Sequence, residues 1–306
     1  MKPILFTHDD CDAHRMHPGH PERPERRQAI MRQLRERKAL EGWDVREPPL
    51  VSREALEHVH EADYLDHLFA SSPGEGLVAL DGDTAMSPGT LRAARLASGA
   101  LEEAVALLTR GEARRVFCAM RPPGHHAESD AAMGFCFFNH VAVGAAAALE
   151  TPGIDRVAVL DFDVHHGNGT VEMFQDRPEV LVCSSFQHPF YPHRYHDVKR
   201  DHIVNTPLPA GTGSEAFRAA IERDWTPAIE KHRPQLIFIS AGFDAHRDDP
   251  LGGLQLDEED FAWVTRWIVS AAEKHAKGRV VSTLEGGYDL DALARSVEVH
   301  LRELAR

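Results

Sequence analysis

Four short apolar runs, each followed by a glycine-containing loop, constrain the fold of this chain most. The runs cover residues 116–119, 157–160, 236–240 and 279–284, and their length and composition are typical of buried strands. Each following loop contains ionisable or phenolic side chains, namely His125 and His126, the segment 161–170, Asp244, and Tyr288. In open parallel α/β sheets, ligands bind outside the carboxyl ends of the strands. If the four runs belong to one such sheet, the four loops meet at one site.

The rest of the chain supports an α/β fold. Strand-like runs alternate with helix-like runs from start to finish, which favours a mostly parallel sheet. Further strands are expected at 1–8 and 180–184. Helical periodicity covers 26–40, 53–69, 90–109, 214–231, 258–274 and 289–304. Residues 187–204 are irregular and are expected to form a long loop near the site. No linker or repeat divides the 306 residues, so we expect one domain over 1–306.

Composition excludes several classes of protein. The net charge of −14 opposes binding to nucleic acid, which needs Lys and Arg against phosphates. The same charge would attract a cationic substrate, or would only keep the protein soluble. The most apolar stretch, 141–149, is far shorter than the roughly 20 residues that span a bilayer, so no membrane association is expected. The N-terminus lacks the layout of a signal peptide. Four isolated cysteines predict reduced thiols and a cytoplasmic location.

Asp163, His165 and Asp244 are candidate metal ligands. Asp161, Asp163 and His165 alternate after the strand-like run 157–160, and an extended backbone would direct all three to one face. Carboxylate and imidazole suit Zn²⁺, and three protein ligands leave positions open for water and substrate. Fe²⁺ accepts the same ligands. The glycines at 167 and 169 are expected to turn the chain sharply. The alternatives are a structural ion pair for Asp163 and His165, and a turn-forming role for Asp244.

His125, His126 and Tyr288 are candidate catalytic residues. Adjacent imidazoles beside a metal suit general acid–base chemistry, although they can also be metal ligands. Asp161 and Asn168 are available to orient them. Our hypothesis is that a carboxylate on His125 holds an imidazolium, whereas neutral Asn168 leaves His126 easier to deprotonate. Tyr288 follows two glycines and would stabilise a developing oxyanion, unless it is only a packing residue.

Aromatic residues indicate a narrow substrate channel. Phe135 follows Gly134, and Tyr191 lies in the irregular segment 187–204. Together they would grip an alkyl chain and leave a terminal amide at the metal. The neighbouring Phe137 and Phe138 are equally well explained as core residues.

Taken together, these residues resemble the arginase/deacetylase superfamily and, within it, the zinc-dependent histone-deacetylase-like amidohydrolases. The resemblance covers nearly the whole chain, in family order. Asn168, the stretch 205–209 and Glu285 resemble class II members. The matching stretches are 20–26, 121–126, 134–139, 161–170, 205–209, 241–244 and 285–288.

The resemblance implies a single α/β domain around an eight-stranded parallel sheet, and hydrolysis of N-acetyl amides with release of acetate. It implies Zn²⁺ on Asp163, His165 and Asp244, with His126 as general base and acid. His125 would be its electrostatic partner, and Tyr288 the oxyanion donor. The remaining implied sites are a structural K⁺ on Asp161, Asp163, His165, Ser184 and Ser185, a substrate-binding rim residue Asp83, and Arg26 near an acetate channel.

The chain departs from the family pattern at two places. Residues 193–196 read His-Arg-Tyr-His where relatives have a glycine-rich turn, and Phe186 replaces a usual histidine.

The substrate prediction depends on one position. Leu251 lies where polyamine-selecting relatives place a glutamate gatekeeper, and leucine cannot pair with a secondary ammonium. We therefore expect acetyl-lysine in peptides or proteins as substrate. The alternative is acetylpolyamine hydrolysis, supported by the nearby Asp248 and Asp249. More distant alternatives are a two-manganese ureohydrolase and a catalytically inactive acetyl-lysine binder. An oligomer is compatible with the sequence.

Overall fold

A single eight-stranded sheet organises the molecule. The computed structural model describes all residues, 1–306. All strand pairings in this sheet are parallel, in the spatial order β2-β1-β5-β10-β9-β6-β7-β8. The parallel sheet of eight strands is therefore confirmed. The strands are β1 (Ile4–Phe6), β2 (Asp44–Arg46), β5 (Arg115–Cys118), β6 (Val157–Asp161), β7 (Val180–Gln187), β8 (Ile203–Leu208), β9 (Leu236–Ala241) and β10 (Val280–Leu284).

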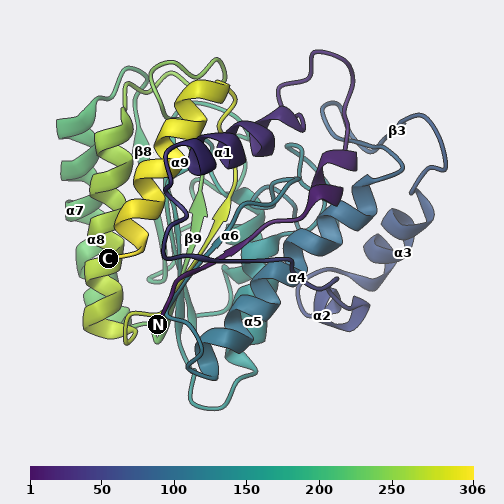
Figure 1. Cartoon of the computed structure of the whole chain (residues 1–306). Helices are drawn as coiled ribbons and strands as arrows, with labels where there is room; N and C mark the ends of the chain where they lie inside the picture. Colours follow the sequence, from purple (N-terminus) through teal and green to yellow (C-terminus); the bar gives the residue numbers. More distant parts are fainter.

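Helices cover both faces of the sheet, because its strands are apolar on both sides. In β6, Val157 and Val159 belong to one hydrophobic cluster, and Ala158 and Leu160 belong to the other. The first cluster packs under α4 (Thr90–Thr109), α5 (His140–Leu149) and α6 (Asn168–Phe174). The second packs under α1 (Glu25–Glu36), α7 (Ser214–His232), α8 (Glu258–His275) and α9 (Leu290–Leu304). Figure 1 shows α7, α8 and α9 on one side of the strands and α4 and α5 on the other.

Most helix predictions agree with the structure. The expected helices at 90–109, 214–231, 258–274 and 289–304 match α4, α7, α8 and α9 within one residue at each end. The first helix ends four residues earlier than predicted, where Lys38 takes a left-handed backbone with φ of 54°. Sequence patterns did not indicate β2, β8, α5 or α6, and β8 begins two residues inside the predicted loop.

The predicted helix over 53–69 is wrong, because two helices occupy that segment. They are α2 (Arg53–Glu57) and α3 (Ala62–Ala70). The break places the buried His60 between two loops of the site. Its Nε2 accepts a hydrogen bond from the backbone N–H of Asn139 at 3.0 Å, and its Nδ1 lies 3.1 Å from the carbonyl of Glu128. Tertiary contacts of one imidazole therefore override the helical pattern.

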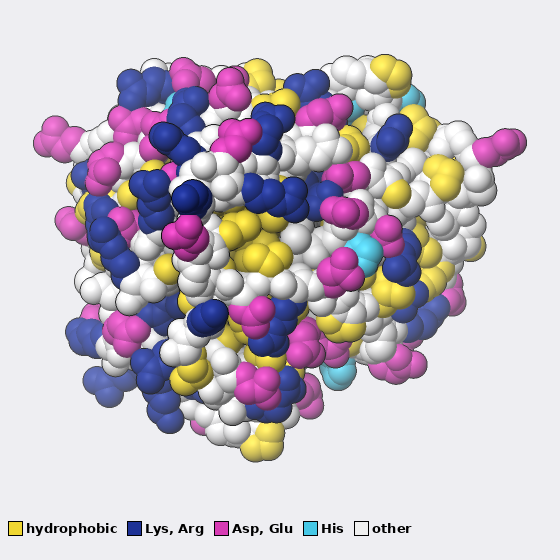
Figure 2. Space-filling model, viewed as in Figure 1, with side chains coloured by type: hydrophobic (Ala, Val, Ile, Leu, Met, Phe, Trp, Pro, Cys, Tyr) yellow, Lys and Arg dark blue, Asp and Glu magenta, His cyan; other side chains and the backbone are white.

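A small antiparallel pair, β3 (Val78–Ala79) and β4 (Ala85–Met86), lies between α3 and α4, and Asp83 lies in its turn. A third hydrophobic cluster packs α2 and α3 against Phe137 and Phe138, so these two aromatics are core residues. None of the helices is both long and apolar enough to cross a bilayer. Figure 2 shows acidic and basic side chains intermixed on the face it presents.

Candidate active site

The four predicted loops do converge. β5, β10, β9 and β6 are neighbours in the sheet, so their carboxyl ends lie side by side. The loops that follow them surround a cavity of about 410 Å³, within the range of small-molecule sites. The lining residues are Asp83, His126, Gly134, Phe135, His165, Gln187, Phe190, Tyr191, Pro250, Leu251, Gly252, Gly253 and Tyr288.

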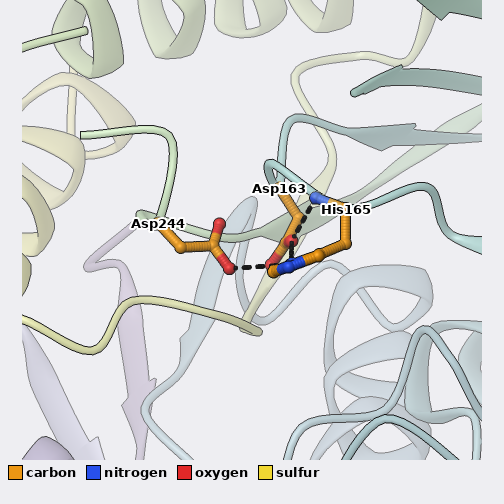
Figure 3. Close-up of side chains that lie close together, drawn as sticks. All are labelled: Asp163, His165 and Asp244. Carbon is orange, nitrogen blue, oxygen red and sulfur yellow. Dashed lines mark hydrogen bonds and ion pairs between the residues drawn. The ribbon is translucent and has the colours of Figure 1, made fainter. Parts of the chain in front are cut away.

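Asp163, His165 and Asp244 meet at one side of the cavity. One ligand-type atom of each lies within 4.8 Å of the others (Figure 3). Nδ1 of His165 is 3.1 Å from Oδ1 of Asp163 and 3.2 Å from Oδ2 of Asp244. The two aspartates follow β6 and β9, which are hydrogen-bonded to each other. Residues 81 positions apart in the sequence are therefore adjacent because their strands are neighbours.

Backbone N–H groups orient the carboxylates of Asp163 and Asp244 in the absence of a ligand. Asp163 accepts hydrogen bonds from the N–H groups of His165 and Gly286, both at 2.8 Å, and Oδ1 of Asp244 accepts one from Val164 at 2.9 Å. A Cβ atom at Gly286 would lie only 1.9 Å from Oδ2 of Asp244. Glycine is therefore needed here for close approach, and the ligand oxygens are oriented by the fold itself.

The cluster fits a divalent cation. Oδ2 of Asp244 is buried and has no hydrogen-bond partner, a cost that a bound cation would remove. Burial and the charge of Asp163 raise the pKa of Asp244 to about 7, so the protein alone does not easily hold both carboxylates ionised. Two carboxylate oxygens and one imidazole nitrogen are a donor set for Zn²⁺ or Fe²⁺.

Asp161 does not belong to this cluster. Strand β6 ends at Asp161, whose Oδ1 accepts a hydrogen bond from the N–H of Asp163 at 3.1 Å. That local turn interrupts the extended backbone, so the expectation that Asp161, Asp163 and His165 share one face was wrong for Asp161. Its Oδ2 instead lies 2.9 Å from Nδ1 of His125.

The two adjacent histidines have opposite environments. Burial alone would lower the pKa of His125, but the charges of Asp161 and Asp163 raise it to about 10. Nδ1 of His126 lies 2.7 Å from Oδ1 of the neutral Asn168. Burial and the charges of His125 and His165 lower the pKa of His126 well below its usual value. These two imidazoles, one with its pKa raised and the other with its pKa lowered, lie side by side with ring centroids 4.0 Å apart.

Glu285 stabilises the loop that contains His125 and His126. Its Oε2 accepts hydrogen bonds from the N–H groups of Gly124 at 2.7 Å and His125 at 3.1 Å. Glu285 was identified in the sequence only through the family resemblance. No local pattern shows that it accepts hydrogen bonds from a turn 160 positions earlier in the chain.

Tyr288 lies on the cavity wall in a firmly held loop. Gly287 has a φ of +122°, a conformation that favours glycine. The guanidinium of Arg26 lies 4.7 Å from the centroid of the Tyr288 ring and donates to the carbonyls of Gly287 and Glu285. Oδ2 of Asp249 accepts a hydrogen bond from the backbone N–H of Tyr288 at 2.6 Å. Arg26 is fully buried, and its contacts orient the Tyr288 loop.

Aromatic rings form the walls of the cavity. Phe190 stacks on His165 with centroids 5.4 Å apart, and Tyr191 meets His126 edge-on at 5.2 Å. Phe135 meets Tyr288 edge-on at 5.9 Å, and a Cβ atom at Gly134 would lie 2.4 Å from the His126 ring. The backbone of this segment therefore packs directly against the His126 ring.

Two polar residues shape the rim. Oδ1 of Asp83 accepts hydrogen bonds from the N–H of Gly134 at 3.1 Å and from the hydroxyl of Thr84 at 2.8 Å. Gln187, which the sequence did not single out, accepts from the N–H of Gly253 at 2.7 Å and so fixes the loop that carries Leu251.

The two aspartates before Leu251 do not line the cavity. Asp249 is buried and accepts backbone hydrogen bonds from Tyr288, Asp289 and Leu251. Asp248 is half exposed and lies 3.6 Å from Arg295. Neither carboxylate lines the cavity, whereas that of Asp83 does.

The remaining predicted positions lie below the site. Asp161 and Ser184 are paired residues of β6 and β7, and Ser185 follows in β7. Phe186 packs edge-on against His166, with centroids 4.6 Å apart. As predicted, the chain turns sharply at Gly167, where the N–H of Asn168 donates to the carbonyl of His166 at 2.8 Å and α6 begins. Close packing explains why glycines are found here, because a Cβ atom at Gly167 would lie 2.3 Å from Oδ2 of Asp161, and one at Gly169 would lie 2.0 Å from the carbonyl of Ala127.

Comparisons with known proteins agree with this geometry. The model of the histone deacetylase domain family matches residues 20–304. A histone deacetylase-like amidohydrolase of Pseudomonas aeruginosa is 42% identical over 251 residues, which cover 80% of this chain and 66% of that protein. A type-2 histone deacetylase 2 of Dictyostelium discoideum is 38% identical over 84% of this chain and 18% of that protein. The crystal structure of the HDA15 HD domain superposes with a TM-score of 0.93 at 30% identity, covering 99% of this chain and 88% of that one. This chain thus spans slightly less than two thirds of the first relative and a small part of the second.

Proposed function

Since the chain belongs to the histone deacetylase family, we propose that it is a metal-dependent deacetylase that hydrolyses the acetylated side-chain amide of lysine in peptides or proteins. The single observation that supports this proposal most is the buried Asp163–His165–Asp244 cluster beside a cationic and a neutral histidine. Class II character and a structural K⁺ near Asp161 and Ser184 are parts of the same proposal.

Asp163, His165 and Asp244 would hold the metal, Zn²⁺ or Fe²⁺. When bound, such an ion would supply Lewis-acid activation of the amide carbonyl and of the attacking water. Asp163, Asp244 and the imidazole of His165 are fixed by backbone hydrogen bonds and by each other, so little reorganisation would accompany binding.

His126 is proposed as the general base and then the general acid. Oδ1 of Asn168 can only accept, so Nδ1 of His126 must carry the proton. The other nitrogen, Nε2, is then the basic one, and His126 lines the cavity. Because its pKa is lowered, His126 is neutral before the reaction and can take a proton from water, then deliver it to the leaving amine.

His125 and Tyr288 are proposed to stabilise the negative charge that develops on the amide oxygen. His125 remains an imidazolium because the carboxylate of Asp161 accepts a hydrogen bond from its Nδ1–H and raises its pKa. Tyr288 is a neutral phenol, since burial raises its pKa well above the usual value. A neutral hydroxyl can donate a hydrogen bond to an oxyanion.

Two features favour acetyl-lysine over an acetylpolyamine, whereas the aromatic walls of Phe135 and Tyr191 suit the alkyl chain of either. Leu251 offers no charge to a secondary ammonium, and Asp248 and Asp249 do not line the cavity. Asp83 lines the cavity, and its carboxylate would accept a backbone N–H of a peptide substrate.

A paired substrate assay tests this function. We expect an acetyl-lysine peptide to give a higher kcat/KM than acetylspermidine or acetylputrescine, and a chelator to abolish both reactions until Zn²⁺ or Fe²⁺ is restored. Leu251→Glu should shift the preference towards the polyamines, because it adds a charge to the cavity wall. Leu50→Glu, at an exposed leucine outside the cavity, is the control. Faster turnover of a polyamine by the unaltered protein would overturn the substrate proposal, and turnover that resists chelation would overturn the metal mechanism.

The alkaline limb of the pH–rate profile should move when Asp161 becomes Asn. Asp161 contributes most to raising the pKa of His125 to about 10, and the protonated form is present below that pKa and is lost above it. Removing the carboxylate lowers this pKa, so kcat should begin to fall at lower pH than in the unaltered protein. The profile of Asp176→Asn, at an exposed aspartate, provides the control. An unchanged alkaline limb in Asp161→Asn would show that His125 does not act as a cation.

A further inference from the structure

The residues 193–196, which depart from the family pattern, follow Tyr191, whose ring contacts His126. His193 and Tyr195 both take left-handed backbone conformations, with φ of 60° and 56°. Residues other than glycine rarely adopt this backbone conformation, because their Cβ atom crowds the following carbonyl oxygen. The loop therefore keeps a glycine-type turn without glycine, and Arg194 lies between the two strained residues.

Arg194 forms an ion pair with a buried carboxylate. Its Nη2 lies 2.8 Å from Oε2 of Glu128, whose side chain is 2% exposed, whereas that of Arg194 is 49% exposed. The backbone around Glu128 is fixed by the turn between α2 and α3, because His60 contacts the carbonyl of Glu128, and the N–H of Glu61 donates to the carbonyl of Ser129. Burial raises the pKa of Glu128, and the hydrogen bond from Asn168 and the charge of Arg194 both oppose that rise. Arg194 thus adds to the contacts that favour the acceptor-only carboxylate form of Glu128.

Glu128 and the backbone carbonyl of His126 together determine which way the amide of Asn168 faces, since Nδ2 of Asn168 also donates to that carbonyl at 3.2 Å. Oε1 of Glu128 is 2.7 Å from Nδ2 of Asn168. An ionised carboxylate can only accept, so the NH₂ group of Asn168 must point to it and Oδ1 must point to His126. That orientation in turn makes Nδ1 of His126 the protonated nitrogen and Nε2 the basic one.

We propose that Arg194 is a positioning residue for this reaction: through Glu128 and Asn168 it fixes His126 in the tautomer that can act as base. The inference rests on the proposed deacetylase function for its kinetic readout. Under this proposal, residues 193–196, which differ from the family pattern, have a role in catalysis. They connect the rim of the cavity to His126. Each of the three contacts in the chain is 2.7–2.8 Å long.

The substitution Glu128→Gln distinguishes an effect that passes through these hydrogen bonds from a simple loss of packing. In Glu128→Gln, the donor-only guanidinium of Arg194 draws the amide oxygen, so the amide NH₂ faces Asn168. A flip of Asn168 then turns its oxygen to the introduced glutamine and its NH₂ to Nδ1 of His126, at the cost of its hydrogen bond to the carbonyl of His126. We expect the flip to prevail, because two NH₂ groups that face each other cannot form a hydrogen bond, and His126 then takes the wrong tautomer. In the double variant with Arg194→Met, the glutamine is free to offer its oxygen to Asn168 again.

Kinetics of four variants test the proposal. We expect Arg194→Met to lower kcat about tenfold and Glu128→Gln about a hundredfold, with KM nearly unchanged. The double variant should be faster than Glu128→Gln alone, and Arg194→Lys should recover most of the activity lost in Arg194→Met. The control is Arg200→Met, since Arg200 is also 49% exposed and pairs with a surface aspartate. Three outcomes would each overturn the proposal. The first is a double variant whose loss of kcat equals the product of the two single losses. The others are a loss confined to KM and equal rates for Arg194→Met and Arg200→Met.

Nitrogen NMR of histidine-labelled protein gives a readout that does not depend on activity. His126 should carry its proton on Nδ1 in the unaltered protein and in Arg200→Met, and on Nε2 in Glu128→Gln, with return to Nδ1 in the double variant. If the unaltered protein hydrolyses no acetylated amine, the proposed function fails, but the tautomer of His126 in each variant still tests the role of Arg194. A proton that stays on Nδ1 of His126 in Glu128→Gln would overturn the positioning role of Arg194.

Discussion

Replacing Asp244 with asparagine should leave the protein without its divalent metal and lower the rate of acetyl-amide hydrolysis by roughly 10³-fold or more. Asparagine keeps the oxygen that accepts from the N–H of Val164, so the loop keeps its shape. It replaces the buried, unpartnered Oδ2 with a neutral amide NH₂ that cannot bind a cation. Metal content by mass spectrometry and acetyl-lysine turnover, measured on the same sample, check this expectation.

Asp248→Asn is the matched control for that experiment. Asp248 lies four residues further along the same loop but is half exposed and faces Arg295 instead of the cavity. It should retain the metal and full activity. If Asp244→Asn binds the metal as well as the unaltered protein, the assignment of the site is wrong.

His126→Gln should lower kcat by roughly 10²–10⁴-fold, the usual contribution of a positioned general base. The metal content should not change, because His126 is not one of the three clustered residues. KM should change little, since the aromatic walls and Leu251 remain in place. Steady-state kinetics with a metal assay on each preparation separate this result from that of Asp244→Asn.

The control for His126→Gln is His202→Gln, at a partly buried histidine that contacts only the carbonyl of Phe174. It should keep its rate. Loss of the metal in His126→Gln would instead make His126 a ligand, which is the alternative that the sequence left open. A loss of activity expressed only in KM would also contradict the role of base.

The sequence was most informative where the residues of the site follow strands. Asp163, Asp244 and Tyr288 could be placed together because parallel strands present their carboxyl ends at one edge of a sheet. The apolar runs of those strands are long enough to be recognised, whereas β2 has three residues and only partial burial, so it has no such signal.

Contacts between distant side chains could not be predicted in the same way. Glu128 and Arg194 are 66 positions apart, and neither a period nor a spacing connects them. The break between α2 and α3 depends on the partners of His60 in two other loops, which no local propensity encodes. Gly169 was identified as special, but its neighbour, the carbonyl of Ala127, is known only from the folded chain.

The order of strands in the sheet also has a consequence for how the chain assembles. β9 and β10 come last in the sequence but lie between β5 and β6, so a chain that ends at residue 233 has two three-stranded halves with no shared edge. These halves join only when β9 and β10 insert between them. Such long-range pairing is slow and leaves strand edges exposed until it is complete. During synthesis, the cavity at the carboxyl ends of the strands can therefore form only after β9 and β10 have left the ribosome.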